Sequence, residues 1–199
     1  LISESFPGQF RNWFYSLLTM STVLEGLSPM KAVFSYALMR DEYGEEMHKS
    51  RGNAIWFDDA AERMGVDAMR WVFVRQNPAA NVSFGFDTAD DVRRRFIIPF
   101  WNVYSFFVTY ADLDGYDPAV TEPLAPLVSD RPELDRWILS ALSSLVAEVT
   151  SALEAFAPDR AAHAAEEFVE YLSNWYVRRS RRRFWKSGLL PGNGGSADL

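Results

Sequence analysis

Hydrophobic positions in the first 80 residues follow two different spacings. Over residues 10–24, apolar side chains recur at helical spacing, and Gly26 then favours the end of a helix. Residues 32–39 form a nearly continuous apolar run of strand length, which is typical of a parallel strand buried on both faces. Two short helices are expected further on, with a break between them at Gly65. Together with the end of a strand at residues 2–4, this order predicts part of an α/β sheet.

The second part of the chain has helical spacing throughout. One apolar stripe runs over residues 87–110, where Pro99 removes a backbone hydrogen bond and is expected to kink the helix. A connector that contains several prolines follows at residues 112–130. Two further stripes, at residues 134–156 and 158–175, predict a pair of amphipathic helices.

These elements predict a mixed, mainly α fold. A partial α/β piece of the Rossmann-like, nucleotide-binding type is expected over residues 1–80, and a partial helical bundle over residues 81–186. Residues 187–199 are rich in glycine and are expected to form a disordered tail.

Composition narrows the chemistry that this chain can perform. Of its 199 residues, 48% are hydrophobic and 15% aromatic, which excludes disorder over most of the length. The chain has no cysteine and two histidines, so thiolate chemistry is excluded and no protein-bound metal is expected. The net charge of −7 argues against coating of DNA. Since there is neither a signal-peptide start nor an apolar run near ~20 residues, we expect a cytoplasmic protein without a membrane partner.

The polar loop after the apolar run carries the strongest candidate chemistry. Residues 47–53 read MHKSRGN and combine cationic and hydroxyl groups with a glycine. Phosphoryl and nucleotidyl transfer depend mainly on positive charge placed where negative charge develops. A lysine on such a loop can close over a triphosphate and then release pyrophosphate. Taken alone, the loop is equally compatible with a solvated turn.

Four segments match motifs that occur together in one known family. The loop is similar to a Lys-Met-Ser-Lys-Ser signature, with Glu46-Met47-His48-Lys49-Ser50 at those positions, and residues 54–70 resemble the stretch that follows it. Residues 9–18 are similar to a Gln-x-Arg-Gly-Trp-Phe-x-Ser helix, and residues 101–106 and 174–185 also have counterparts. On these motifs the chain resembles the class I aminoacyl-tRNA synthetases, and within them the isoleucyl branch of the isoleucyl, valyl and leucyl group.

The resemblance implies a reaction in two steps. Isoleucine and ATP, the latter with Mg²⁺ as its substrate complex, would give isoleucyl-adenylate and pyrophosphate. The acyl group would then pass to the 3′ end of tRNA(Ile), which is the reaction of an isoleucine–tRNA ligase. In the family, the second signature lysine stabilises the phosphates, so Lys49 is the implied catalytic residue. The implied ATP-binding residues are Met47, His48, Lys49 and Ser50, and the implied substrate-binding residues are Gln9 and Trp13.

The loop departs from the family signature at two positions. Glu46 stands in place of the first lysine, and His48 in place of the first serine. A carboxylate ~4 Å from a phosphate would cost on the order of 4 kcal/mol at an effective dielectric near 20. Glu46 is therefore expected to point away, toward Arg51 or the tRNA side, while His48 could replace the serine as a hydrogen-bond donor.

The His-x-Gly-His motif of this family is absent from the 199 residues. We therefore expect the second half of a catalytic domain followed by the start of an anticodon-binding domain, and a piece that cannot make adenylate alone. The full-length form is expected to be monomeric. Two alternatives stay open, namely a non-catalytic RNA-binding helical module and a synthetase of the valyl or leucyl type.

Basic residues cluster near the end of this otherwise acidic chain, with six Lys and Arg within the nine positions 178–186. Arginine suits forked phosphate contacts, and each contact adds salt-sensitive affinity. The tRNA-binding candidates are Arg178, Arg179, Arg181, Arg182 and Arg183. Some of them could instead pair with Glu166, Glu167 or Glu170 of the same bundle. Trp175, Tyr176 and Trp185 are expected in the core, because base stacking needs exposed rings.

Overall fold

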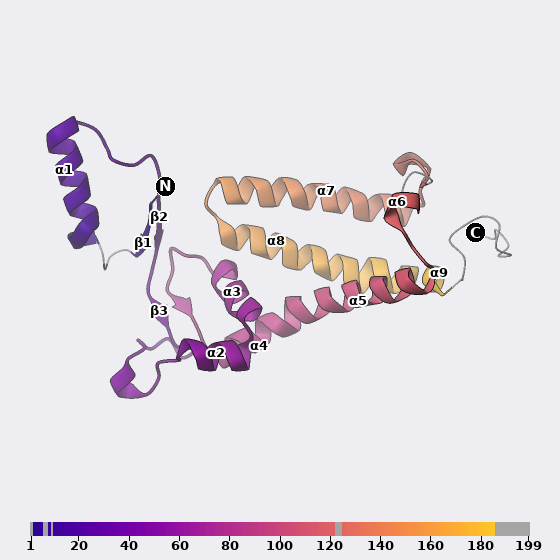
Figure 1. Ribbon diagram of the computed structural model, residues 1–199, viewed down its shortest axis with the longest axis horizontal. Coiled ribbons are helices and arrows are strands. Elements are labelled where there is room, and N and C mark those ends of the chain that lie inside the picture. The colour runs from indigo at the N-terminus through magenta and orange to yellow at the C-terminus, as the bar shows by residue number, and fades with distance from the viewer. Residues whose placement is uncertain (1, 6–7, 9, 122–124, 186–199) are drawn as a thin grey trace. The chain divides into compact units, whose positions relative to one another are not determined.

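The computed structural model describes residues 2–5, 8, 10–121 and 125–185 (Figure 1). The chain divides into two compact units, of which unit 1 comprises residues 1–92 and 150–163 and unit 2 comprises residues 93–149 and 164–199. The domain limits predicted at residues 80/81 and 186/187 stay predictions, because compactness in space does not define a family domain. The predicted disordered tail lies outside the described residues.

Unit 1 begins with two parallel strands joined by a helix. Strand β1 (Ile2–Ser5) pairs with β2 (Val33–Tyr36) in parallel register. Between them lie a kinked helical turn, η1 (Phe10–Phe14), and helix α1 (Tyr15–Glu25). The helix ends at Gly26, which has a φ of 69° and donates its N–H to a carbonyl one turn earlier. A parallel pair needs such a crossover, so the predicted α/β piece is confirmed.

The apolar run at residues 32–39 is not one buried strand. It divides into β2 and the short strand β3 (Met39–Arg40), which pairs in parallel with β4 (Val82–Ser83). In the described residues β2 has β1 as its sole neighbour, and its Val33 and Tyr36 are 38% and 40% exposed. The parallel pairing is confirmed, but the prediction of burial on both faces is wrong because no second layer covers this strand pair among the described residues.

The core of unit 1 lies among three short helices, α2 (Phe57–Met64), α3 (Val66–Arg75) and α4 (Phe86–Val92). Gly65, with a φ of 83°, separates the first two as predicted. The buried apolar side chains of these three helices and of the residue after β4 are Ala60, Met64, Ala68, Met69, Val72, Phe84, Ala89 and Val92. Each larger member contributes about 1.5–3 kcal/mol by leaving water. This packing holds the start of α2 and the residues after β4 in place. Since α2 follows the polar loop of residues 47–53, it also holds the C-terminal end of that loop.

The predicted helix over residues 87–110 is divided among α4, η3 (Arg93–Ile97) and α5 (Ile98–Leu113). Pro99 lies in the first turn of α5, where its missing N–H needs no partner, and the preceding η3 is a wider π-type turn. The predicted irregularity at Pro99 therefore takes the form of a π turn. The connector that follows contains only short elements among its described residues, α6 (Pro118–Thr121) and η5 (Val128–Asp130).

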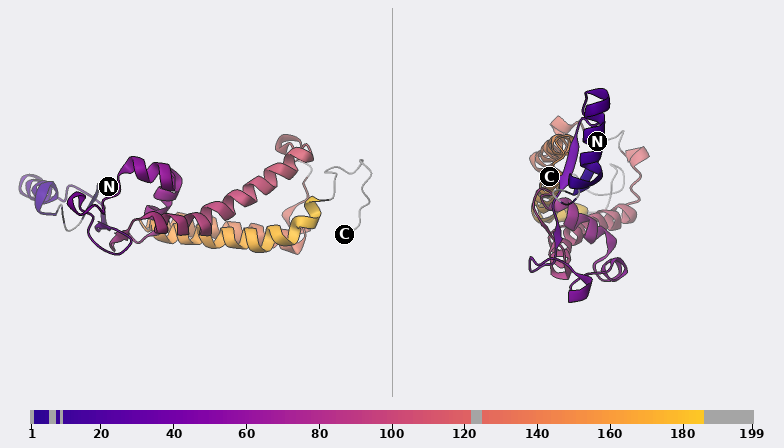
Figure 2. Two further views of the ribbon diagram at one scale, coloured as in Figure 1. Left: turned by 90° about the horizontal axis from the view of Figure 1, so that it is seen from below. Right: turned by 90° about the vertical axis from the view of Figure 1, so that its left-hand side faces the viewer.

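The C-terminal helices are α7 (Glu133–Glu154), α8 (Pro158–Glu170), η6 (Tyr171–Val177) and α9 (Arg178–Phe184). The parts of α7 and α8 that belong to unit 2 run side by side (Figures 1 and 2) and line a hollow of about 220 Å³. The two predicted amphipathic helices are therefore confirmed.

By length and composition alone, α7 could cross a membrane. Its first turn, however, carries Glu133 and Asp135, and Asp135 forms an ion pair with Arg183 of α9. A single helix of sufficient length and apolar composition is weak evidence for a membrane span. The absence of a membrane partner stays a prediction.

Candidate functional site

The loop between β3 and α2 begins with a tight turn built on Asp41. Its Oδ1 accepts hydrogen bonds from the backbone N–H groups of Tyr43 at 3.1 Å and Glu45 at 2.8 Å. Gly44 has a φ of 84°, a conformation that favours glycine. Arg40 Nη1 donates to the Gly44 carbonyl at 2.9 Å. These contacts turn the chain back on itself just before the candidate signature residues.

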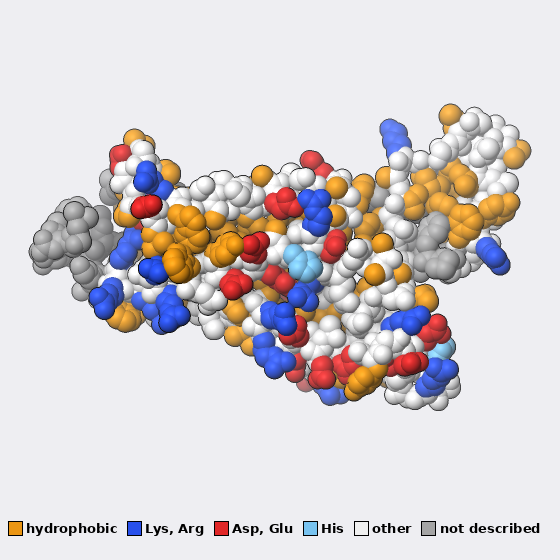
Figure 3. Space-filling model, turned by 180° about the vertical axis from the view of Figure 1, so that it is seen from behind, with side chains coloured by type: hydrophobic (Ala, Val, Ile, Leu, Met, Phe, Trp, Pro, Cys, Tyr) orange, Lys and Arg blue, Asp and Glu red, His pale blue; other side chains and the backbone are white. Residues whose placement is uncertain are grey.

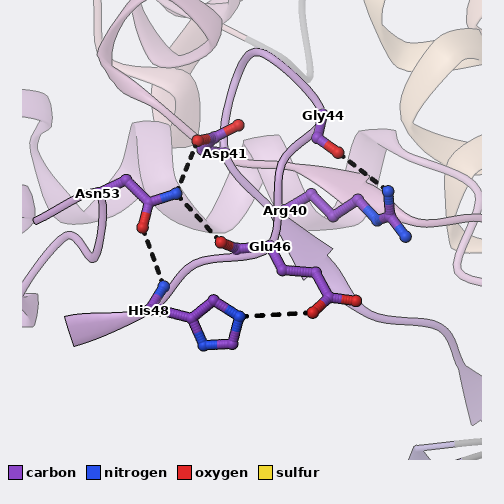
Figure 4. A network of polar contacts seen from close by, with 6 residues as sticks. All are labelled: Arg40, Asp41, Gly44, Glu46, His48 and Asn53. Atoms are coloured by element: carbon purple, nitrogen blue, oxygen red, sulfur yellow. Dashed lines mark hydrogen bonds and ion pairs between the residues drawn. The ribbon is translucent and has the colours of Figure 1, made fainter. Parts of the chain in front are cut away.

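Asn53 connects the two ends of the signature loop, which we define as residues 46–53 (Figure 4). Its Nδ2 donates to Asp41 Oδ2 at 2.9 Å and to the Glu46 carbonyl at 3.1 Å. Its Oδ1 accepts from the His48 N–H at 2.9 Å. The hydrogen bond from Asn53 is the largest cause, and that from the Glu45 N–H the next, that holds the pKa of the Asp41 carboxyl below its ordinary value. The base of the signature loop is therefore ordered by side-chain contacts.

The tip of the signature loop is a single 3₁₀ turn, η2 (Lys49–Arg51), and all of its side chains are exposed. Gly52 closes the turn with a φ of 73° and donates its N–H to the Lys49 carbonyl at 3.3 Å. The Lys49 Nζ lies 4.6 Å from the ring centroid of Trp56, within the range of a cation–π contact. The ammonium group is thus at the surface and not locked in the interior, as a role in binding phosphate requires.

The two positions that depart from the family signature contact each other. His48 Nε2 lies 3.4 Å from Glu46 Oε2 (Figure 4), and both side chains are about half exposed. At such exposure an ion pair contributes about 0–1 kcal/mol. The Glu46 carboxylate is directed to His48 and not to Arg51 in the described part of the chain, and the expected direction toward the tRNA side stays a prediction.

A polar cavity of about 300 Å³ lies beside the end of the signature loop. Its lining includes Asp41, Glu42, Asn53, Asp59, Arg63 and Gly85. Glu42 Oε2 accepts the Asp87 N–H at 3.1 Å, and a Cβ at Gly85 would collide with the Glu42 carboxylate. Sequence reasoning missed this cavity because part of its wall, residues 84–86, lies more than 20 residues after the rest of the lining.

The residues predicted on the amino-acid side lie upstream of the loop. Trp13 lies in η1, is 38% exposed, and its ring centroid is 6.0 Å from that of Phe14. Gln9 lies outside the described residues. Met47 is half-buried, whereas His48 and Ser50 are exposed. The substrate- and ATP-binding roles of these residues stay predictions.

The five candidate tRNA-binding arginines have different surroundings on α9. Arg183 donates from both Nη atoms to the Asp135 carboxylate, at 2.6 and 2.7 Å. The Arg179 guanidinium lies 3.8 Å from the ring centroid of Trp175. The other three, Arg178, Arg181 and Arg182, are exposed and have no hydrogen-bond or ion-pair partner among residues 2–5, 8, 10–121 and 125–185. Three of the five are therefore free to meet an anion.

Asp135 ties α9 to the start of α7 within unit 2. Besides Arg183, it accepts a hydrogen bond from the Tyr176 hydroxyl at 2.9 Å. The hydrogen bonds from Arg183 are the main cause that lowers the pKa of the Asp135 carboxyl, and burial is the main cause that raises the pKa of Tyr176. The Arg183 guanidinium is thus paired with Asp135 and not with one of the glutamates considered from the sequence, and its tRNA-binding role stays a prediction.

Aromatic rings lie at the surface beside the arginine-rich helix α9, which we call the basic helix. Trp175 is 48% exposed and Trp185 is 62% exposed, so the expectation that they lie in the core is wrong. The buried positions here are Val177 at the end of η6 and the small Ser180 of α9, and the indoles lie outside them. Figure 3 shows Lys and Arg side chains gathered with hydrophobic ones around α9.

No metal centre is apparent in the described part of the chain. Residues 2–5, 8, 10–121 and 125–185 contain no group of three or more His, Asp or Glu side chains that could hold a metal ion. The use of ATP with Mg²⁺ as its substrate complex stays a prediction.

Two sequence families match this chain. The model of the family "tRNA synthetases class I (I, L, M and V)" matches residues 3–85. The model of the family "Anticodon-binding domain of tRNA ligase" matches residues 135–191. The first match contains the signature loop, and the second contains the basic helix.

Curated relatives point to the same class. The chain is 45% identical over 180 residues to an isoleucine–tRNA ligase of Dehalococcoides mccartyi, which covers 90% of this chain and 17% of that protein. It is 43% identical over 194 residues to that of Thermus thermophilus (92% and 18%) and 40% identical over 198 residues to that of Bacillus thuringiensis (95% and 19%). The chain thus spans less than a fifth of the length of these relatives.

A solved structure shares the fold. A crystal structure of a LeuRS of Agrobacterium radiobacter, in ternary complex with tRNA and LeuAMS, superposes with a TM-score of 0.65 at 17% identity. The match covers 92% of this chain and 23% of that one. This structure shows that the fold is shared. The family matches and the curated relatives show that the chain is similar to the class I aminoacyl-tRNA synthetases over most of its length. Within that class its similarity is to isoleucine–tRNA ligases, over about nine-tenths of its length.

Proposed function

We propose that this chain supplies the signature loop and part of the tRNA-binding bundle of an isoleucine–tRNA ligase. That enzyme activates isoleucine with ATP to isoleucyl-adenylate and then transfers the acyl group to tRNA(Ile). The single observation that carries this proposal is the placement of Lys49. Its ammonium group is exposed on a one-turn tip whose two ends are tied together by Asn53.

In the proposed reaction, Lys49 stabilises negative charge on the phosphates as pyrophosphate leaves. A positioned cation acts on charge that develops in the transition state, where it is worth more than in bulk water. The contact with Trp56 does not oppose this role, since an exposed cation–π contact is worth only about 0.5–1 kcal/mol. Met47, His48 and Ser50 complete the proposed ATP-binding segment, and Gln9 and Trp13 the amino-acid side.

The test is ATP–pyrophosphate exchange in a complete enzyme. The matching segment of the Thermus thermophilus ligase, to which the chain is 43% identical, is replaced by this chain, and Lys49→Ala is introduced. We expect exchange to fall about 10²–10³-fold, the effect of removing one preorganised donor. The matched control is Arg51→Ala, which removes a cation from the same exposed turn and should change exchange by less than about threefold.

An unchanged exchange rate with Lys49→Ala would contradict the proposed role of the loop. Salt-dependent binding of tRNA by the grafted enzyme, with no isoleucine-dependent exchange at all, would instead favour a non-catalytic RNA-binding module. The cytoplasmic location proposed from the sequence is independent of these outcomes.

For the tRNA side, we propose that Arg178, Arg181 and Arg182 contact phosphates of tRNA(Ile). Their exposure and lack of partners in the described part of the chain support this, and the structural relative was solved with tRNA. Replacing all three by Gln should reduce the slope of log K against log salt by about 2–3. Arg183→Gln is the matched control, because its charge is already paired and the slope should change by less than about 1. Equal slopes for the triple variant and the parent would refute the assignment.

A further inference from the structure

Three hydrogen bonds to one side chain close the base of the signature loop. Asn53 is the last residue of the loop, Asp41 precedes the loop, and Glu46 and His48 stand at its start, yet all four meet (Figure 4). The turn that carries Lys49 lies between the His48 N–H and Asn53 itself. Any displacement of this turn as a whole must therefore stretch or break contacts of Asn53.

The chemistry of the three partners dictates an amide at position 53. The Asp41 carboxylate and the Glu46 carbonyl can only accept, whereas the His48 N–H can only donate. An asparagine offers two N–H donors on one side and a carbonyl on the other, which matches this set in one orientation. An aspartate would turn an acceptor toward the Asp41 carboxylate, and an alanine would leave all three groups without this partner.

Asp41 in turn holds Asn53 from a rigid position. It is 9% exposed, and its other oxygen accepts two backbone N–H groups of its own turn, those of Tyr43 and Glu45. The carboxylate therefore cannot swing to follow the loop. It fixes the amide of Asn53, and through it the start of the lysine-bearing turn.

We propose that Asn53 is a positioning residue for the ligase reaction, which sets the place of Lys49 by fastening both ends of the signature loop to Asp41. This inference rests on the proposed function of Lys49. Asn53 itself touches no substrate in this scheme, and it lies outside the buried cluster of α2, α3 and α4. Its loss should therefore free the loop without unfolding the unit.

The first test uses the 199-residue chain and needs no activity. Trypsin cuts after Lys49 and Arg51 only when the loop opens, and cleavage after Arg63 in α2 gives an internal reference. We expect Asn53→Ala to raise the loop cleavage rate about tenfold relative to that reference, and Asn53→Asp to raise it further. The matched control is Asn77→Ala, since Asn77 also bonds a nearby backbone N–H, that of Ala79, but away from the loop.

The second test separates positioning from mere stability in the grafted ligase. Asn53→Ala should lower the exchange kcat about tenfold in the parent, but by less than about twofold when Lys49→Ala is already present, because two residues that act through one group are not additive. Equal losses in both backgrounds, or unchanged trypsin cleavage of Asn53→Ala, would overturn the proposal.

The two tests also separate this inference from the proposed function. If Lys49→Ala leaves exchange unchanged, the function of the loop fails, and with it any positioning role for Asn53. If Lys49→Ala is inactive as expected while Asn53→Ala is fully active, the proposed function stands and only the present inference fails.

Discussion

Asp135→Ala is predicted to destabilise the helical bundle of unit 2. The Asp135 side chain is 12% exposed and accepts three hydrogen bonds, from the Arg183 guanidinium at 2.6 and 2.7 Å and from the Tyr176 hydroxyl at 2.9 Å. These bonds join the first turn of α7 to η6 and α9. Removal of the carboxylate leaves both partners without their acceptor.

The size of the loss follows from the exposure of each partner. The Tyr176 hydroxyl is partly buried, and loss of its acceptor costs about 1–3 kcal/mol. The Arg183 side chain is 53% exposed and can be solvated again, so loss of the ion pair adds about 0–1 kcal/mol. We therefore expect Asp135→Ala to lower the free energy of unfolding by about 2 kcal/mol. This corresponds to a fall in Tm of about 4–8 °C for a chain of this length.

The assay is thermal unfolding of the 199-residue chain, followed by circular dichroism at 222 nm. Asp135→Asn should show about half the effect, because it keeps an acceptor for Tyr176 but loses the charge. Asp130→Ala is the control, since Asp130 is exposed and its recorded side-chain bond is to the neighbouring Ser129. A Tm for Asp135→Ala within about 1 °C of the parent would refute the reasoning.

The pH dependence of this effect has a definite sign. Arg183 holds the pKa of Asp135 below its ordinary value of about 3.9. A carboxyl with a lowered pKa in the folded state contributes stability that is present above the ordinary value and is lost as pH falls through the lowered one. The difference in Tm between the parent and Asp135→Ala should thus have its maximum value at pH 6 and become smaller below about pH 4.

Two further predictions concern the signature loop. Asn53→Ala should raise the pKa of Asp41, because the hydrogen bond from Asn53 is the largest cause that lowers this pKa. Titration of the Asp41 carboxyl followed by NMR measures the change. An unchanged titration midpoint would contradict the Asn53–Asp41 hydrogen bond. Glu46→Lys combined with His48→Ser restores the family signature, and in the grafted ligase it should lower the KM for ATP about two- to fivefold, because it replaces a surface anion by a cation near the polyphosphate. A higher KM would mean that the native pair itself supports ATP binding.

Local sequence patterns predicted most of the elements because their causes are local. Helical spacing over residues 10–24 and the glycine at position 26 are read within one segment, and α1 ends where they indicate. The break at Gly65 is of the same kind. Burial is not local. The apolar run at residues 32–39 has the composition of a covered strand, but its exposure depends on which other layers are present.

The basic helix shows why side-chain roles were harder to predict than helices. The five arginines at positions 178–183 look equivalent in sequence, yet one is bound to an aspartate 48 residues away and another lies on an indole. The pairing with the aspartate depends on how α7 and α9 meet, which periodicity does not encode. The indoles of Trp175 and Trp185 follow the same rule, since their place on an apolar stripe did not decide whether a neighbour would cover them.

The altered signature gives the clearest case of two departures that compensate. Glu46 alone would place a carboxylate in a loop that should meet phosphates, and a repulsion of several kcal/mol would follow at ~4 Å. In the structure that carboxylate is directed to the His48 imidazole, the other residue that departs from the signature. A negative charge that is turned toward a neighbouring imidazole repels an approaching polyphosphate less than a free one does. The Lys49 ammonium, three residues further on, then remains available on the exposed turn.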